Sequence, residues 1–153
     1  MDSDAYAFTD FEGFGEEALR ILFFTRKQVT QWGGQNVSPA HLLLALVEVA
    51  PETVSRFVAR RGVSIESVVT DVKAGVAGES APAVELEIPI SAELEGVLGR
   101  ARAEARALRH DAVDAGHLTL ALSIAAKERP VAGLPEGTFL PPEEIRRSLR
   151  NGT

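Results

Sequence analysis

The sequence contains no cysteine, and this absence excludes several kinds of site at once. None of its 153 residues can form a disulfide, act as a thiolate nucleophile or bind a metal through sulfur. A metal site built on histidine would need a second ligand at helical spacing, as in His-x-x-x-His or Glu-x-x-His. Neither His41 nor His117 has such a neighbour. The sequence therefore predicts no metal and no cofactor.

Positive charge and long apolar runs are also scarce. Lysine and arginine number 16 against 22 acidic residues, a net charge of −6, which argues against a general affinity for nucleic acid. No run approaches the roughly 18 apolar residues needed to span a bilayer. The acidic start of the chain has neither the basic region nor the apolar core of a signal peptide. We expect a cytosolic protein that contacts neither nucleic acid nor membrane.

Motifs of catalysis are missing as well. The sequence has no phosphate-binding Gly-x-x-x-x-Gly-Lys-Ser/Thr loop and no nucleophile elbow. The segment Gly13-Phe-Gly15 partly matches a dinucleotide-binding fingerprint, but no predicted strand precedes it. These absences predict a protein that is not an enzyme.

What the sequence does contain is a repeat at an offset of 76 residues, about half of the chain. Val37–Leu46 returns as Val113–Leu122, and six of the ten positions are identical, including His41 and His117. One copy of a short helical unit cannot bury its apolar face alone, so two copies are expected to pack around a shared core.

Hydrophobic periodicity predicts an all-α fold of seven or eight helices. Apolar residues recur at three- and four-residue spacing, and Pro39 and Pro51 occupy first helical positions, where a missing N–H costs nothing. The expected helices of the first copy span residues 16–32, 38–49, 51–62 and 64–72. The second copy begins at Ser91, its second helix at Asp114, and its closing helix spans residues 141–149. Residues 128–138 contain too much proline and glycine for a long third helix.

The domain organisation follows from these elements. We expect an N-terminal segment at residues 1–13, a first repeat at 14–75, a linker at 76–90 and an abbreviated second repeat at 91–150. His41 and His117 each follow a helix cap by three residues, where the positive helix end disfavours an imidazolium ion. We expect both to be neutral imidazoles that fix the helix starts. His110 resembles a surface cation at a helix C-terminus.

This pattern resembles the N-terminal domain of Clp ATPases over residues 11–150. In that family each repeat opens with Phe-Thr and a long helix, followed by Leu-Gly-His and then Gly-Thr-Glu-His-Ile-Leu-Leu-Gly-Leu. In the first copy, Phe14-Gly15 corresponds to Phe-Thr, and Val37–Leu46 corresponds to the final Gly-Thr-Glu-His-Ile-Leu-Leu-Gly-Leu run. Their counterparts in the second copy are Ile90-Ser91, Leu108–His110 and Asp114–His117.

The resemblance implies two tandem, pseudo-symmetric four-helix repeats packed as one Clp N-terminal-like domain, the second repeat abbreviated. It implies a bacterial, free-standing adaptor, accessory subunit or decoy, whose partners are a Clp ATPase, a Clp peptidase or their substrates. Some members of the family bind phosphorylated arginine through the Glu of each Gly-Thr-Glu-His motif. Ala40 and Gly116 occupy those positions here, so the carboxylates that would pair with a guanidinium are missing.

A candidate docking surface follows from the aromatic residues near the first helix. Phe11 and Phe14 precede this helix and Phe23 lies on it. Ile90 stands at the matching start of the second repeat. One helix stripe cannot bury so many, and we hypothesise that some form an exposed apolar patch. Glu16 and Glu95 would add an acidic rim suited to a basic or arginine-bearing segment. In the alternative, the phenylalanines pack the N-terminal segment onto the core.

Two other function classes remain open at this level. The first is a small-molecule sensor or resistance protein that holds a hydrophobic small ligand in the groove between the two first helices. The second is an enzyme whose catalytic groups meet only in the fold.

Overall fold

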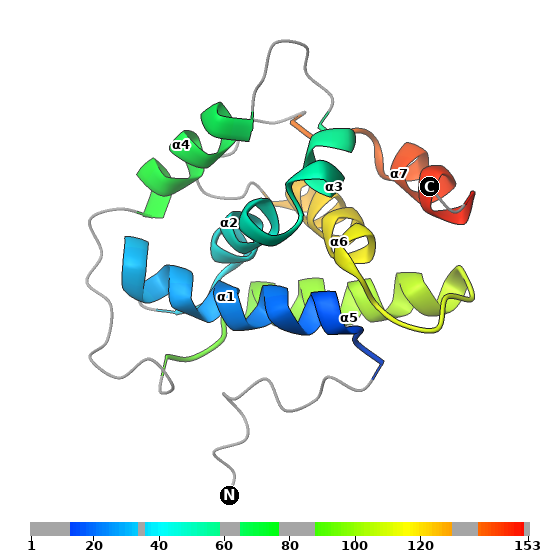
Figure 1. The fold of residues 1–153 in the computed structure, drawn as a ribbon, viewed down its shortest axis with the longest axis horizontal. Helices are drawn as coiled ribbons and strands as arrows, with labels where there is room; N and C mark the ends of the chain where they lie inside the picture. The colour runs from blue at the N-terminus through cyan, green and yellow to red at the C-terminus, as the bar shows by residue number, and fades with distance from the viewer. Residues whose placement is uncertain (1–12, 34–35, 59–64, 77–87, 130–137, 152–153) are drawn as a thin grey trace, which may run out of the picture.

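The computed structural model describes residues 13–33, 36–58, 65–76, 88–129 and 138–151. Within these ranges the chain forms seven helices and three isolated β-bridges, with no longer strand pairing. The helices are α1 (Glu16–Trp32), α2 (Pro39–Val49), α3 (Pro51–Arg56), α4 (Ile65–Val76), α5 (Ala92–Ala107), α6 (Ala115–Glu128) and α7 (Pro142–Arg150) (Figure 1). The predicted all-α fold is confirmed. None of these helices is long and apolar enough to cross a membrane.

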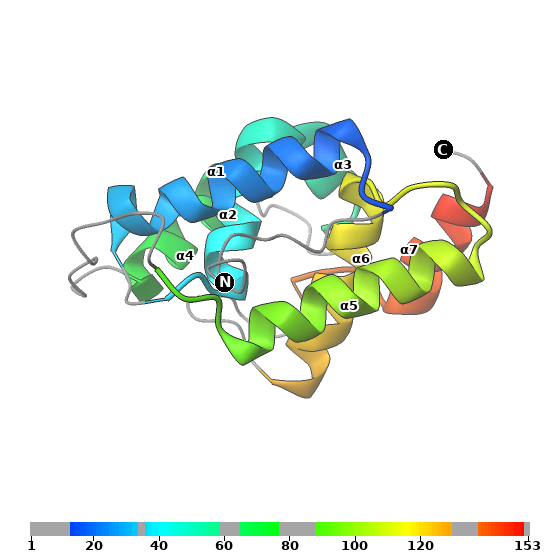
Figure 2. The same ribbon diagram turned by 90° about the horizontal axis from the view of Figure 1, so that it is seen from below.

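The two repeats interlock around a central pair of helices. In the first repeat α1 packs on α2, in the second α5 packs on α6, and α2 and α6 contact each other. Figure 1 shows α1 and α5 along the same side of the molecule, and Figure 2 shows that they run in opposite directions. This arrangement is what a two-fold pseudo-symmetry between the repeats requires.

Two parallel β-bridges join the repeats crosswise. Phe14, just before α1, pairs with Val113, just before α6, and Val37 pairs with Ile90 in the same way. Adding 76 to 14 and 37 gives 90 and 113, so the second bridge is the pseudo-symmetric copy of the first. The hydrogen bonds repeat too, since Gly15 N–H donates to Val113 O at 2.8 Å and Ser91 N–H donates to Val37 O at 2.9 Å.

The core is centred on α2 and α6, as their almost wholly apolar sequences predict. Every residue of α2 from Ala40 to Leu46 is buried, and so is every residue of α6 from Ala115 to Ser123. Helices apolar on all sides are stable only when neighbours surround them. A smaller cluster joins α3, α6 and α7 through Phe57, Leu120, Ile145 and Leu149.

The third helix is shorter than the sequence predicts, because the chain leaves α3 after Arg56 to pair with the segment before α7. Phe57 O accepts a hydrogen bond from Leu140 N–H at 2.9 Å, and Val58 forms an antiparallel bridge with Phe139. The fourth helix is longer than expected and ends at Val76. Predictions for residues 1–12, 59–64, 77–87 and 130–137 lie outside the described residues.

Candidate functional site

The two repeated histidines form equivalent capping structures at the starts of α2 and α6. Both imidazoles are buried. The backbone N–H of Ser38 donates to Nδ1 of His41 at 3.2 Å, and that of Asp114 donates to Nδ1 of His117 at 3.0 Å. Nε2 of His41 lies 2.7 Å from the carbonyl oxygen of Gly33, which can only accept, so this ring carries a proton on Nε2. Nδ1 of His117 also lies 3.1 Å from Oδ1 of Asp114. This geometry matches the predicted role of histidines that fix helix starts.

The acid that caps α6 is held in its charged form. Burial opposes ionisation of the Asp114 carboxyl, but hydrogen bonds and charge from His117 and a hydrogen bond from Gly116 N–H outweigh it, and the pKa of Asp114 is lowered. The part of the chain that the structure describes contains no group of three or more His, Asp or Glu able to hold a metal ion.

The prediction that His110 is a surface cation is wrong. His110 is half-buried, and its Nδ1 lies 2.8 Å from Nε2 of His117. A left-handed residue turns the chain inward, since Arg109 has φ 61° where the Clp pattern has glycine. The N–H of His110 then bonds Ala105 O and that of Arg109 bonds Arg106 O, the two hydrogen bonds of a Schellman motif.

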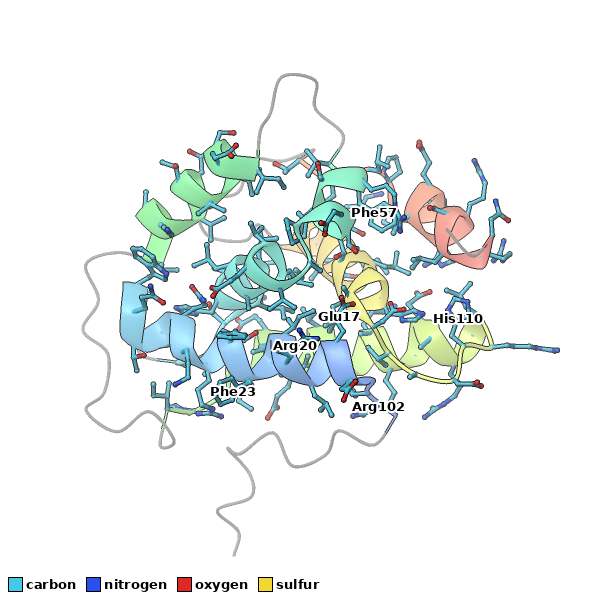
Figure 3. The ribbon with its side chains drawn as sticks, in the orientation of Figure 1. Glu17, Arg20, Phe23, Phe57, Arg102 and His110 are labelled. Atoms are coloured by element: carbon cyan, nitrogen blue, oxygen red, sulfur yellow. The ribbon has the colours of Figure 1, made fainter. Side chains whose placement is uncertain are left out.

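The outer face of α1 carries an exposed apolar pair. Leu19 and Phe23 are 41% and 58% exposed, and among the described residues they are the large hydrophobic side chains that remain exposed. They are four residues apart, so their side chains are neighbours on one face of the helix. Phe23 meets Phe24 edge-on at 5.6 Å between ring centres, and Lys27 Nζ lies 5.0 Å from the centre of the Phe23 ring. We call Leu19 and Phe23 the α1 patch; Phe23 is labelled in Figure 3.

The other apolar residues of the predicted patch are placed differently. Phe14 is buried beneath the guanidinium of Arg102, whose Cζ lies 5.3 Å from the ring centre. Ile90 is half-buried and bridged to Val37. Both side chains contribute to the join between the repeats, so the exposed surface is smaller than the sequence suggested. Phe11 lies outside the described residues.

The two acids of the predicted rim are exposed but do not flank the same site. Glu16 lies in the first turn of α1 and Glu95 in the first turn of α5. These two helices begin at opposite ends of the side they share (Figure 2). Glu16 is one turn from Leu19 and is the acid of this pair that borders the α1 patch.

The two positions that lack the family glutamate are buried. Ala40 and Gly116 lie in the first turns of α2 and α6. A Cβ atom built on Gly116 would lie 2.5 Å from Cδ2 of Leu149 in α7, which is closer than real Cβ contacts come. A larger side chain at Gly116 would therefore require the Leu149 side chain of the closing helix to shift.

Two features of the structure were not predicted from the sequence: the exposure of Leu19 beside Phe23, and the ion pair between Arg146 and Glu104. Leu19 lies outside the buried stripe of α1, and its four-residue spacing to Phe23 was the available signal in the sequence.

Arg146 of α7 donates two hydrogen bonds of 2.9 Å to the carboxylate of Glu104 in α5. The hydrogen bonds from Arg146 lower the pKa of Glu104, against the opposing effect of burial. No local pattern in the sequence marks this pair.

The sequence matches the family model of the Clp repeat (R) N-terminal domain over residues 16–132. The chain belongs to this family. Domains of the family are protein-interaction modules of Clp ATPases.

The chain is 25% identical over 139 residues to the chloroplastic chaperone protein ClpC of Pisum sativum, covering 91% of this chain and 15% of that protein. It is 26% identical over 112 residues to a ClpA homolog of Guillardia theta, an ATP-binding subunit of the Clp protease, covering 73% of this chain and 14% of that protein.

Solved structures show the same fold. The Hsp104 N-terminal domain from Candida albicans superposes with a TM-score of 0.65 and 20% identity, over 92% of this chain and 93% of that one. The N-terminal domain of ClpD from Arabidopsis thaliana gives a TM-score of 0.61 and 21% identity, over 80% and 84% of the two chains. The predicted architecture of a Clp N-terminal domain is thereby confirmed. The chain spans about 15% of the length of the curated relatives it matches.

Proposed function

We propose that this chain is a non-enzymatic docking domain of Clp-type proteolysis that receives a protein partner on the α1 patch, as an adaptor, an accessory subunit or a decoy. The observation that carries the proposal is the exposure of Leu19 and Phe23 on a helix whose other face is fully packed. Exposed apolar side chains that lie together on an otherwise polar surface are typical of protein-interaction sites. We propose the cytosol as its compartment.

The surroundings of the α1 patch indicate the chemistry of the partner. Glu16 is exposed one turn before Leu19, and the whole chain carries a net charge of −6. A partner segment that sets an apolar side chain on the patch and a basic side chain against Glu16 complements both features. We propose such a segment as the occupant.

Phosphoarginine is a poor candidate for a ligand at the family positions. Ala40 and Gly116 provide no carboxylate, and the space beside Gly116 is filled by Leu149. A guanidinium needs an acidic partner to form the paired hydrogen bonds that make such contacts strong. The small-molecule alternative gains no support from the comparisons, and we do not propose it.

Three binding measurements with the purified chain distinguish the roles. An adaptor binds a Clp ATPase of the encoding organism, an accessory subunit binds its Clp peptidase, and a decoy binds an unfolded substrate such as casein in competition with the N-terminal domain of the ATPase. We expect saturable binding in one of the three assays and no ATP hydrolysis by the chain. Absence of binding in all three would contradict the proposal.

A further inference from the structure

A pocket of about 390 Å³ opens beside the second half of α5. Its lining comes from α5, from the turn that leads to α6 and from the residue before Phe14. The lining residues used below are Gly13, Arg102, Arg106, His110, Asp111 and Ala112. Figure 3 shows Arg102 and His110 on the side of the molecule where the α5–α6 connection runs. The pocket is separate from the α1 patch, and its role is independent of the function proposed above.

The pocket concentrates basic groups in an acidic protein. Arg102, Arg106 and His110 face it, with Asp111 as the one acid of the lining. The Arg106 side chain is exposed, and within the described residues it forms no ion pair or hydrogen bond. A planar guanidinium offers a fork of N–H donors that matches the oxygens of phosphate and carboxylate.

His110 adds an imidazole to this lining. Its Nδ1 lies 2.8 Å from Nε2 of His117, and in the described part of the chain its own Nε2 has no hydrogen-bond partner. An imidazole nitrogen that carries a proton can donate it to an oxyanion.

The turn adds backbone donors. The N–H groups of Asp111 and Ala112 make no hydrogen bond with the described residues. Unpaired N–H groups of consecutive residues in a turn are favourable neighbours for an anion. Two arginines, the imidazole of His110 and the residues of these unpaired peptides thus line one pocket.

We propose that this pocket binds a tetrahedral oxyanion, a phosphate or a phosphoryl group. The volume exceeds that of a bare phosphate, which leaves room for the side chain that would carry a phosphoryl group. The two guanidinium groups together outweigh the single charge of Asp111, so the pocket favours a ligand with more than one negative charge over a single carboxylate.

Titration with inorganic phosphate at constant ionic strength tests the proposal, with the backbone amides followed by NMR. We expect saturable shifts at Gly13 and between Ala105 and Val113, and weaker binding of acetate. Arg106→Gln should weaken phosphate binding at least fivefold, because a charge-assisted hydrogen bond is lost. Asp111→Asn should tighten it, because a repelling charge is removed. Both side chains are exposed, so neither change should disturb folding.

Arg147→Gln is the matched control, since Arg147 is an exposed arginine of α7 outside the pocket lining. Its affinity for phosphate should equal that of the parent. Shifts that do not saturate, equal weakening by Arg106→Gln and Arg147→Gln, or no tightening by Asp111→Asn would overturn the proposal. A phosphoserine peptide that binds more tightly than phosphate would assign the site to a protein-borne phosphoryl group, and equal affinity would assign it to a free anion.

Discussion

Val113, at the entrance to α6, pairs with Phe14, at the entrance to α1, in a parallel β-bridge. Each repeat therefore begins against the middle of the other. The buried central helices α2 and α6 contact both halves of the chain. Neither half can complete its core without its partner, so we expect the two repeats to unfold as one unit.

The first prediction concerns this shared core. Leu44→Ala and Leu120→Ala should each lower the free energy of unfolding by about 2–5 kcal/mol, because both leucines are buried and each change leaves a cavity. Leu19→Ala, at an exposed leucine, is the matched control and should change it by roughly 0.5 kcal/mol or less. Denaturant unfolding should show a single transition in every variant. Two separate transitions, one for each repeat, would contradict a shared core.

The second prediction compares two helical glycines. Gly116→Ala should destabilise the fold by about 1–3 kcal/mol, because the new methyl group would overlap the Leu149 side chain. Gly99→Ala in α5 should stabilise it by about 0.5–1 kcal/mol, because nothing lies near its added methyl group and alanine favours the helix. Thermal unfolding of both variants measures the difference. A neutral Gly116→Ala would show that α7 moves aside freely.

The third prediction is a pH dependence of the contact between α5 and α7. The pKa of Glu104 is lowered in the folded state, so its contribution to stability is present above the ordinary pKa of Glu, about 4.3. It is lost as the pH falls through the lowered folded pKa. Arg146→Gln should cost about 1–3 kcal/mol at pH 7, because hydrogen bonds to a charged group are lost.

The cost of Arg146→Gln should shrink steadily on acidification below that range, as Glu104 loses its charge in the parent as well. Arg147→Gln, at an exposed neighbour, is the control and should have little effect at any pH. The same cost for Arg146→Gln at pH 7 and at pH 2 would show that the ion pair contributes nothing.

The fourth prediction is that His41 and His117 bind no metal. In each ring Nδ1 accepts a backbone hydrogen bond, and each Nε2 has a protein partner at 2.7 or 2.8 Å, the carbonyl of Gly33 or the imidazole of His110. Elemental analysis of the purified protein should therefore find no stoichiometric zinc. Zinc that disappears in His41→Ala would contradict the structural role.

The sequence predicted the helices and their pairing well because these depend on local periodicity and on the repeat. The starts of α1 and α2, and the burial of both central helices, follow from apolar spacing and from Pro39. The repeat also pointed to the equivalence of Phe14 with Ile90 and of Val37 with Val113. Their cross-pairing needed the three-dimensional structure.

What the sequence did not predict depends on contacts between segments far apart in the chain. The end of α3 is set by the hydrogen bond from Leu140 to Phe57, which lies more than 80 residues away along the chain. His110 was misinterpreted because a left-handed Arg109 is not recognisable from residue type. In the candidate docking site, Phe14 and Phe23 are equally aromatic, and only the fold shows that one is buried and the other exposed.

The central claim, docking of a protein partner on the α1 patch, is tested most directly by one pair of affinities. The Leu19→Ser/Phe23→Ser variant is compared with Ala103→Ser/Ala107→Ser, which places two serines on exposed positions of α5. Binding is measured to the Clp component or substrate that the parent chain binds, after circular dichroism has shown both variants to be folded. We predict that the first variant binds at least tenfold more weakly, a loss of about 1.4 kcal/mol, and that the second retains the parent affinity. Equal affinity of the two folded variants would contradict the account.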